Sequence, residues 1–450
     1  MPRTTQDPQL SGWGRLPVPG REICSTDLAA VARTRPLTRG LGRSYGDASL
    51  PPSYALEVAG SQLADRVLAF DPATGILRAE AGLTLREILR LYLPRGFWPP
   101  ASPGTAFVTL GGMVAADVHG KGHIRDGTFG RHVRSLRLLV ADGRVIDCDR
   151  EREPGLFRAT LGGMGLTGHI LEVEVKLQRI PSPWIVEERR RYDDLDSLLA
   201  ALRSAANDWP YTVAWIDSLA TGRSLGRGIV MLGRWAEPDE APAARPRERR
   251  RWRVPIDLPA WCLSPFTMGL FNSWLFATAP RTPRRRVLSP ESFFYPLDTL
   301  EDWNRMYGAR GFTQYQCVVP EADRPGATRR FLEQLVALGG ASFFSVLKEF
   351  GDEGEGLLSF PRPGVTIAID LPIRPGTTDL VARLNHVVAA EGGRIYLAKD
   401  ALSSAADFAG LEPRLPAFLA ERARWDPEGR LGSALAERLF SPAAGVLAAT

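Results

Sequence analysis

The chain has 450 residues, of which 44% are hydrophobic, 24% charged and 9% aromatic; this balance excludes a disordered chain, and the length allows two domains of typical size. Its 44 glycines follow no three-residue period and it has four cysteines, which excludes collagen-like and disulfide-scaffold proteins. The formal net charge is +5, but residues 245–286 alone carry ten Arg against Glu248 and Asp257, so the basic patch is local and we expect no nucleic-acid partner.

The first residues and the cysteines bear on localisation. Residues 1–7 have no apolar run behind a basic residue, so we expect no signal peptide. Cys24, Cys148, Cys262 and Cys317 are widely spaced and form no zinc pattern, which is typical of free thiols in a reducing compartment. We therefore expect a cytoplasmic protein without a bound metal, with peripheral contact at the inner face of the membrane as an open question.

Residues 30–180 are dense in glycine and in short runs of strand-forming residues. The pattern predicts a short amphipathic helix over Leu85–Leu93 and a half-buried strand over Ile170–Leu177. Two further runs, Leu138–Val140 and Val145–Ile146, flank Asp142-Gly143, which predicts a tight hairpin with a type I′ turn.

After Pro181-Ser182-Pro183 the sequence changes to helical patterns that alternate with strands. We predict helices at Leu195–Asn207, Ala327–Leu338 and Thr378–Glu391, and strands at Tyr211–Asp217, Gly228–Gly233, Phe312–Val319, Ser342–Phe350 and Thr366–Ile373. No part resembles a βαβ series, so the fold class is α+β, with an antiparallel sheet covered by helices. We expect domains at 1–182 and 183–392, and a C-terminal part, 393–450, that returns to the first domain.

The basic patch brackets an uncharged aromatic stretch. Leu258 to Pro280 spans 23 residues without a charge, yet Pro259, Pro265 and Gly269 make it a poor membrane span. Two interpretations stay open. Either residues 245–286 place aromatic rings at headgroup depth and arginines on anionic lipid, or the stretch packs on the protein's own core or forms a disordered basic linker.

Three glycine-rich loops lie between residues 39 and 168. The first, Arg39 to Asp47, can hold anionic oxygens on its backbone N–H groups, but its G-x-G-x-x-x-G spacing is not the Rossmann fingerprint. The second runs from Ser102 to His123 and the third from Gly162 to Gly168. Because small residues leave room for a flat, bulky group, the three loops together predict a dinucleotide site without a Rossmann helix.

The loops carry motifs that resemble a known family. RGLGRSYGD, SPGT, TLGG, DVHGKGH, GTFGRHVRS, GGMGLTG, WNRMYG, QYQ and YLAKD occur in the same order as in the PCMH-type FAD-binding fold of the vanillyl-alcohol-oxidase (p-cresol methylhydroxylase) superfamily, and most closely in its decaprenylphosphoryl-β-D-ribose 2′-oxidase family. The resemblance covers about residues 35–440 and implies non-covalent FAD. It also implies oxidation of the 2′-hydroxyl of a polyprenyl-phosphate-linked ribose to the 2′-keto sugar.

In that family, an NAD(P)-dependent reductase partner completes the epimerisation to the arabinose precursor of cell-wall arabinan. Two alternatives remain open: an FAD-dependent oxidase or dehydrogenase of a soluble sugar alcohol, aldonolactone or hydroxy acid, and a catalytically silent membrane-associated binding protein that kept the fold. At two positions this chain departs from the family pocket. It has Ala368 in place of a cysteine and Phe294 in place of a tyrosine, which leaves the shape of the substrate open.

Transferred position by position, the resemblance implies a cofactor cradle, a substrate pocket and three catalytic residues. The cradle comprises Arg39, Gly40, Leu41, Gly42, Arg43, Ser44, Tyr45, Gly46, Asp47, Gly104, Thr109, Leu110, Gly111, Gly112, Ala116, Asp117, Val118, His119 and Tyr396. The pocket comprises Lys121, Trp215, Gln314, Gln316, Lys348, Phe350, Ala368 and Lys399. The catalytic residues are Lys399, His119 and Tyr45.

The lysines support this assignment independently, because Lys121, Lys176, Lys348 and Lys399 are the only lysines among 56 basic residues. Lysine is a compact charge whose pKa shifts on burial, so these are candidates for positions where Arg would not serve. Strand alternation places Lys399 beside Ile395 and Leu397 on an apolar face, where a buried cation needs a partner.

The expected chemistry divides among five of these side chains. Lys399 would stabilise the reduced flavin, unless it is a surface lysine at the end of a strand. Lys348 suits the substrate phosphate, Gln314 and Gln316 suit sugar hydroxyls, and His119 can accept or relay the hydroxyl proton.

Overall fold

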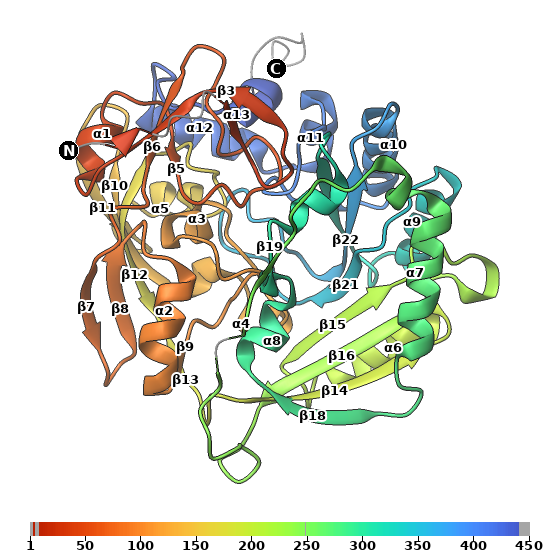
Figure 1. Cartoon of the computed structure of the whole chain (residues 1–450). Coiled ribbons are helices and arrows are strands. Elements are labelled where there is room, and N and C mark those ends of the chain that lie inside the picture. The colour runs from red at the N-terminus through yellow and green to blue at the C-terminus, as the bar shows by residue number, and fades with distance from the viewer. Residues whose placement is uncertain (1–2, 5–8, 248, 441–450) are drawn as a thin grey trace.

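The computed structural model describes residues 3–4, 9–247 and 249–440 of the chain. Its N-terminal part, coloured red to yellow in Figure 1, is built on two sheets. One has the strand order β1-β4-β6-β5, with bounds Arg3–Thr4, Arg21–Cys24, Glu57–Gly60 and Thr38–Arg39. The other is antiparallel, has the order β11-β10-β12-β8-β7, and has bounds Val145–Asp149, Val133–Leu139, His169–Lys176, Ile76–Glu80 and Val67–Asp71.

Short helices and two-stranded ribbons complete this part. The helices are α1 (Leu28–Ala32), α2 (Leu85–Tyr92), α3 (Leu110–Ala115), α4 (His123–Asp126) and α5 (Pro154–Thr160). The ribbons pair β2 (Gln9–Ser11) with β3 (Pro17–Pro19), and β9 (Phe97–Trp98) with β13 (Gln178–Arg179). Helix α2 buries Leu85, Ile88, Leu89 and Tyr92, which is the apolar stripe that the sequence predicts.

An eight-stranded antiparallel sheet follows, with the strand order β18-β14-β16-β15-β21-β22-β20-β23. The bounds in that order are Arg284–Leu288, Ile185–Tyr192, Gly228–Trp235, Tyr211–Ile216, Ser345–Phe350, Gly364–Pro372, Phe312–Val319 and Arg394–Ile395. Helices α6 (Leu195–Ala205), α9 (Ala327–Ala337) and α10 (Thr377–Ala390) cover one face. The predicted α+β class is confirmed, and each predicted strand and helix of this region is present with small differences at its ends. The expected domain boundaries after residues 182 and 392 remain a prediction.

The predicted type I′ turn is wrong. Strands β10 and β11 do form a hairpin, but Leu139 pairs with Val145 and the Gly143 amide donates to the Val140 carbonyl at 2.9 Å. Only Gly143, at φ +86°, has a left-handed backbone in this loop, whereas a type I′ turn requires two such residues. The loop is therefore one residue longer, with the glycine in the position typical of a G1 bulge.

Aromatic packing joins the first two sheets to the eight-stranded sheet. The ring of Trp98 on β9 lies 5.1 Å from that of Trp235 on β16 and 4.7 Å from that of Phe294 in helix α8 (Pro290–Phe294). Trp98 is completely buried, so this contact is part of a continuous hydrophobic core. The glycine-rich loops are thereby held over one face of the eight-stranded sheet.

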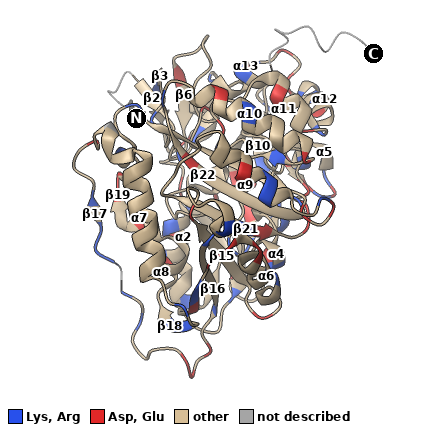
Figure 2. Cartoon of the chain, turned by 90° about the vertical axis from the view of Figure 1, so that its right-hand side faces the viewer, with Lys and Arg blue, Asp and Glu red and all other residues tan. Residues whose placement is uncertain are grey.

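Residues 249–286 include a helix with one exposed apolar side. Strand β17 (Trp252–Arg253) pairs in parallel with β19 (Leu300–Glu301), and η4 (Ala260–Leu263) leads into helix α7 (Pro265–Thr278). Helix α7 buries Met268, Asn272 and Phe276, and its opposite side is exposed. Figure 2 shows α7 as a largely uncharged rod near blue segments of β17 and β18. No helix in the described part of the chain is long and apolar enough to cross a membrane.

The C-terminal helices clamp the first glycine-rich loop. Helices α11 (Ala405–Leu411), α12 (Leu415–Trp425) and α13 (Ala434–Phe440) follow β23 and pack against α10, α5 and one another. From α13, the Arg438 guanidinium bonds Asp47 at 2.7 Å and Asp400 at 2.8 Å. Because Asp400 directly follows Lys399, one half-buried cation holds both the loop and the turn that carries the lysine.

Replacing Arg438 with Met should lower the free energy of unfolding by about 3 kcal/mol, because Asp47 and Asp400 would be left as unpaired, largely buried carboxylates. Chemical denaturation of the flavin-loaded protein measures this loss. Arg430→Met is the matched control, since Arg430 pairs with Glu428 in solvent and its loss should cost less than about 1 kcal/mol. Equal losses in the two variants would contradict the clamp.

Candidate active site

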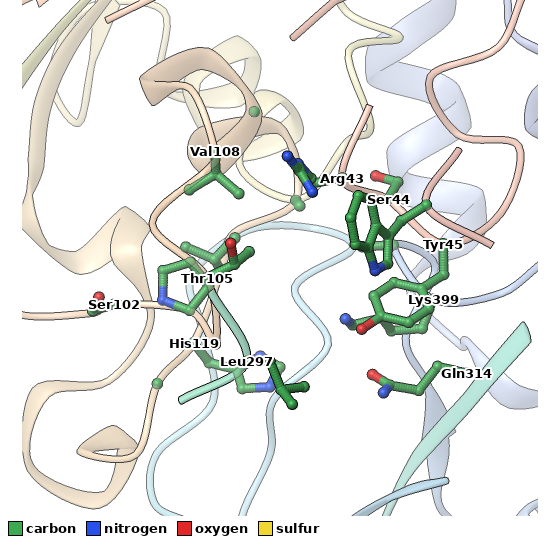
Figure 3. A pocket seen from close by; sticks show the side chains of 18 of the residues that line it. Arg43, Ser44, Tyr45, Ser102, Thr105, Val108, His119, Leu297, Gln314 and Lys399 are labelled. Atoms are coloured by element: carbon green, nitrogen blue, oxygen red, sulfur yellow. The ribbon is translucent and has the colours of Figure 1, made fainter. Parts of the chain in front are cut away.

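A cavity of about 460 Å³ lies between the glycine-rich loops and one face of the eight-stranded sheet. This volume is typical of cofactor and ligand sites. Its walls come from residues as distant as Trp13 and Lys399. Figure 3 shows Tyr45, Lys399 and Gln314 grouped at one side and His119 and Thr105 across from them, with Arg43 and Val108 above.

Two glycine-rich loops make a backbone-lined cradle at one end of the cavity. Gly42 has φ +60°, in the left-handed region that favours glycine. A Cβ on Gly40 would lie 2.4 Å from the Thr109 hydroxyl oxygen, so only glycine allows the two loops to approach. Thr109 in turn caps α3 by accepting the Gly112 amide at 3.2 Å. The cradle therefore exposes main-chain atoms instead of side chains, as an anionic oxygen requires.

The structure brings most of the predicted site residues together. Those that line the cavity are Gly40, Leu41, Gly42, Arg43, Ser44, Tyr45, Gly104, Thr109, Gly111, Gly112, Ala116, Val118, His119, Lys121, Trp215, Gln314, Gln316, Lys348, Ala368, Tyr396 and Lys399. Those that stand behind its wall are Arg39, Gly46, Asp47, Leu110, Asp117 and Phe350. Asp117, for example, is fully buried and accepts hydrogen bonds from the Gly130 amide and the Ser359 hydroxyl.

His119 is a buried, neutral histidine. Burial, together with the charges of Lys348 and Lys399 and the ring of His123, holds the pKa of His119 well below its usual value. Its Nε2 atom lies 3.1 Å from the Gln316 amide nitrogen, so Nε2 accepts a hydrogen bond from that amide. The Nδ1 atom is buried without a protein partner in the described residues. The ring therefore has spare hydrogen-bonding capacity in the cavity wall.

Lys399 lines the same end of the cavity as His119, among other polar side chains. Its Nζ atom is 3.6 Å from the centre of the Tyr45 ring. Burial lowers the pKa of Lys399 to about 7, while the charge of Asp370 acts to raise it. Asp370 is itself held by the Tyr307 hydroxyl at 2.6 Å and the Gln314 amide at 2.5 Å. Burial and the buried Asp370 carboxylate therefore act on the pKa of Lys399 in opposite directions.

The position of Lys399 differs from the predicted strand face. Strand β23 ends at Ile395, and the chain then turns, with the Lys399 amide donating to the Tyr396 carbonyl at 2.9 Å. The alternation that pairs Lys399 with Ile395 and Leu397 therefore does not apply. The turn places Lys399 in the cavity, and the Tyr396 hydroxyl bonds the Ala116 carbonyl at 2.9 Å below the second loop.

Two further lysines enter the cavity away from Lys399. Lys348, on β21, has its pKa lowered to about 8 by burial alone. The pKa of Lys121 is lowered to about 7, chiefly by burial, and its ammonium donates to the Phe293 carbonyl and lies 4.2 Å from the centre of the Phe293 ring. Lys176, late in β12, is exposed and remote from the site.

Several residues of the wall were not predicted from the sequence. They include Trp13, Thr105, Glu187, Arg189, Met231, Leu297 and Asp298. Glu187 and Arg189 lie on β14, whose run of charged residues conceals its strand character in the sequence, although two-residue alternation would have placed both on one face. Trp13 precedes every motif, and its contact with Arg43, at 4.1 Å from the ring centre, has no local signal in the sequence.

The residues present fit a flavin dinucleotide. The backbone cradle, in which a side chain would collide, matches a pyrophosphate, and the small residues Ala115, Ala116 and Gly112 leave a flat wall. The unpartnered His119 Nδ1 and the cation of Lys399 supply polar contacts for a ring system that gains negative charge on reduction.

Comparison with known proteins agrees with this fit. The model of the FAD binding domain family matches residues 26–149. The chain is 34% identical to decaprenylphosphoryl-beta-D-ribose oxidase of Mycolicibacterium smegmatis, over 97% of this chain and 98% of that protein. It is also 34% identical to an uncharacterized protein of Streptomyces coelicolor, over 79% of this chain and 100% of that protein. A putative D-arabinono-1,4-lactone oxidase of Neurospora crassa is 30% identical over 33% of this chain and 26% of that protein.

The link between Lys399 and Asp370 predicts a titration shift that can be observed directly. Because the chain has few lysines, carbon-13 labelling of lysine gives a simple NMR spectrum, and the Lys399 signal is assigned by its loss in Lys399→Met. We expect that signal to titrate near pH 7, and at lower pH in Asp370→Asn, because the variant lacks the charge that raises the pKa of Lys399.

Asp298→Asn is the matched control, since Asp298 is a carboxylate of the cavity wall that accepts a hydrogen bond from the Ala106 amide at 2.8 Å. It should leave the Lys399 titration unchanged. A Lys399 signal that keeps its midpoint in Asp370→Asn would contradict the coupling.

Proposed function

Because this chain belongs to the decaprenylphosphoryl-β-D-ribose oxidase family of FAD-dependent oxidoreductases, we propose that it oxidises the 2′-hydroxyl of a polyprenyl-phosphate-linked ribose to the 2′-keto sugar. The observation that carries the proposal is the convergence of His119, Gln316 and Lys399 on one cavity beside a backbone cradle. A neutral base, paired amides and a cation are the groups that dehydrogenation of a sugar alcohol needs.

FAD is the cofactor, and when bound it supplies the acceptor for the hydride that leaves the carbon bearing the hydroxyl group. In our proposal the cradle of Arg39 to Asp47 and Thr109 to Gly112 holds its pyrophosphate, without a covalent bond to the protein. His119 takes the hydroxyl proton at Nε2, where the substrate hydroxyl replaces the Gln316 amide as the partner. Loss of that proton and of the hydride converts the alcohol to the ketone.

The remaining groups orient the sugar and balance charge. Gln314 and Gln316 present amides from alternate positions of β20, and Asp370 fixes the first of them. Charged Lys399 stabilises the negative charge that gathers beside it during the reaction. Ala368 lies in the wall between Val346 and Gln316. Alanine is smaller than the cysteine of the family, so it widens this part of the pocket, and the difference removes no charge.

The proposal includes an enzyme partner. A 2′-keto sugar is the first half of an epimerisation, and a reductase of the NAD(P)-dependent class would return the hydroxyl group on the other face, forming the arabinose precursor. Similarity to lactone oxidases is confined to about a third of the chain, so a soluble sugar or lactone is the weaker candidate substrate.

Anaerobic mixing of the flavin-loaded protein with substrates tests the reaction and Lys399 together. We expect farnesylphosphoryl-β-D-ribose to bleach the flavin, and free ribose, gulonolactone and lactate to leave it oxidised. Lys399→Ala should lose the flavin or slow bleaching at least about 100-fold, because the cation that balances the reduced state is gone. Lys176→Ala, which alters an exposed lysine, should react as the wild type does. A fully active Lys399→Ala would contradict this role.

We also propose that residues 245–286 contact an anionic membrane surface, where a lipid-linked substrate resides. Helix α7 and its approach expose Phe266 by 81%, Trp261 by 70%, Leu270 by 66% and Trp274 by 59%. Exposed arginines of β18 flank this apolar side, so aromatic burial and attraction to anionic headgroups act together. The occupant that fits this combination is the inner face of a membrane.

Replacing Phe266, Leu270 and Trp274 together with Gln should weaken binding to vesicles of phosphatidylglycerol and phosphatidylcholine by at least about tenfold, because three apolar side chains no longer enter the headgroup region. Sedimentation of the vesicles measures this loss. The double variant Tyr54→Gln/Leu56→Gln removes two equally exposed apolar residues elsewhere and should bind as the wild type does. Unaltered binding of the triple variant would contradict the membrane contact.

A further inference from the structure

The cavity extends along the eight-stranded sheet, away from Lys399. Its floor crosses the strands from Gln316 on β20 and Ala368 on β22, through Val346 on β21 and Trp215 on β15, to Met231 on β16. It ends at Glu187 and Arg189 on β14, close to the edge strand β18. We refer to the part from Lys348 to Arg189 as the distal arm.

Cations exceed anions in the distal arm. Lys121, Arg189 and Lys348 all line it, and Lys121 is close enough to both of the others for their charges to lower its pKa. The carboxylate there is Glu187, which already pairs with Arg286 at 2.5 Å. The other carboxylate of the described cavity wall, Asp298, bonds the Ala106 amide. The arm therefore contains positive charge that the protein does not balance.

Arg189 is the least satisfied of these cations. Its guanidinium makes no hydrogen bond within the described chain, and its Nε atom is buried without a partner. Burial lowers the pKa of Arg189, and the charge of Glu187 acts to raise it. The two side chains form no direct ion pair in the described structure. By comparison, Lys399 at the other end has Asp370 as its counter-charge. Arg189 is half-buried. Because withdrawing a cation from water without a counter-charge is costly, its position indicates that a ligand supplies the anion.

We propose that Lys121, Arg189 and Lys348 form an anion subsite that binds the phosphodiester of the substrate, and that Arg189 determines the preference for phosphorylated sugars. The planar guanidinium can donate hydrogen bonds to two phosphate oxygens at once, while the two lysines act as point charges. The identity of the ligand rests on the proposed function, because a ribose held at His119 and Gln316 carries its phosphate toward Lys348.

The apolar floor gives the prenyl chain a route away from this subsite. Trp215 and Met231 line the cavity and also pack with Phe276 and Leu275 of α7. A chain that leaves the phosphate across these residues therefore reaches the helix whose other side is exposed and aromatic. The charged group stays among cations and the lipid stays on apolar side chains, so one arm accommodates both halves of the substrate.

The test compares two substrates on flavin-loaded protein: farnesylphosphoryl-β-D-ribose and farnesyl β-D-ribofuranoside, which lacks the phosphate. In Arg189→Met we expect KM for the phosphorylated substrate to rise about tenfold to a hundredfold with kcat nearly unchanged, because a charged hydrogen bond is lost in binding. KM for the phosphate-free substrate should not change. Arg189→Lys keeps the positive charge but loses the planar pair of N–H donors, so its KM for the phosphorylated substrate should lie between those of the wild type and Arg189→Met.

Arg190→Met is the matched control. Arg190 is the next residue of β14, is exposed on the opposite face, and lies over the ring of Tyr192. It should leave both KM values unchanged. An equal rise in KM for both substrates in Arg189→Met, or no rise in either, would overturn the proposal.

A second measurement separates this subsite from the reaction. Calorimetry with inorganic pyrophosphate on the flavin-loaded protein should show binding that weakens in Arg189→Met and with added salt, even if neither ribose compound is oxidised. Binding that is present in the flavin-free protein and abolished by FAD would assign the anion to the cofactor cradle instead and would overturn the proposal. Failure of oxidation with intact pyrophosphate binding would count against the proposed function alone.

Discussion

The cost of burying lysine charges in one cavity governs the arrangement of this site. Lys121, Lys348 and Lys399 all line that cavity, and burial lowers the pKa of each toward neutrality. At one end Asp370 offsets the cost for Lys399. At the other end the cations outnumber the available carboxylate, and in our proposal a bound anion offsets the remainder. The two ends therefore suit different tasks, charge stabilisation during oxidation and recognition of a phosphate.

The fold makes this burial possible by holding two independent surfaces together. Glycine-rich loops provide a backbone surface, and the eight-stranded sheet provides a face of spaced side chains. The core around Trp98 sets their separation, while Arg438 fixes Asp47 and Asp400 and thereby the turn that presents Lys399. Helix α7 closes the sheet face with Phe276 and leaves its opposite side to solvent. The redox end is thus enclosed, and the lipid end opens toward an apolar surface.

Much of the fold and site could be predicted from the sequence, because strand alternation and small-residue loops are local signals. The order of the loops and the strands that carry Gln314 and Lys348 follow from such signals, whereas the set of site residues follows from the family resemblance. Long-range pairing does not leave a local signal. Asp370 as the partner of Lys399, and Arg189 on a strand concealed by its charged run, required the three-dimensional structure. Lys399 lines the cavity, but strand alternation does not explain its position, because a turn replaces the strand after Ile395.

In our proposal the chain places C2 of a prenylphosphoryl ribose to lose hydride to FAD, while its own residues take the proton and balance the charges. The most direct measurement is the rate of anaerobic flavin bleaching by farnesylphosphoryl-β-D-ribose that carries deuterium at C2, compared with the unlabelled compound. We predict that deuterium at C2 slows bleaching severalfold and that deuterium at C3 has no effect. Bleaching that responds to C3 and not to C2, or no bleaching by either compound, would contradict the account.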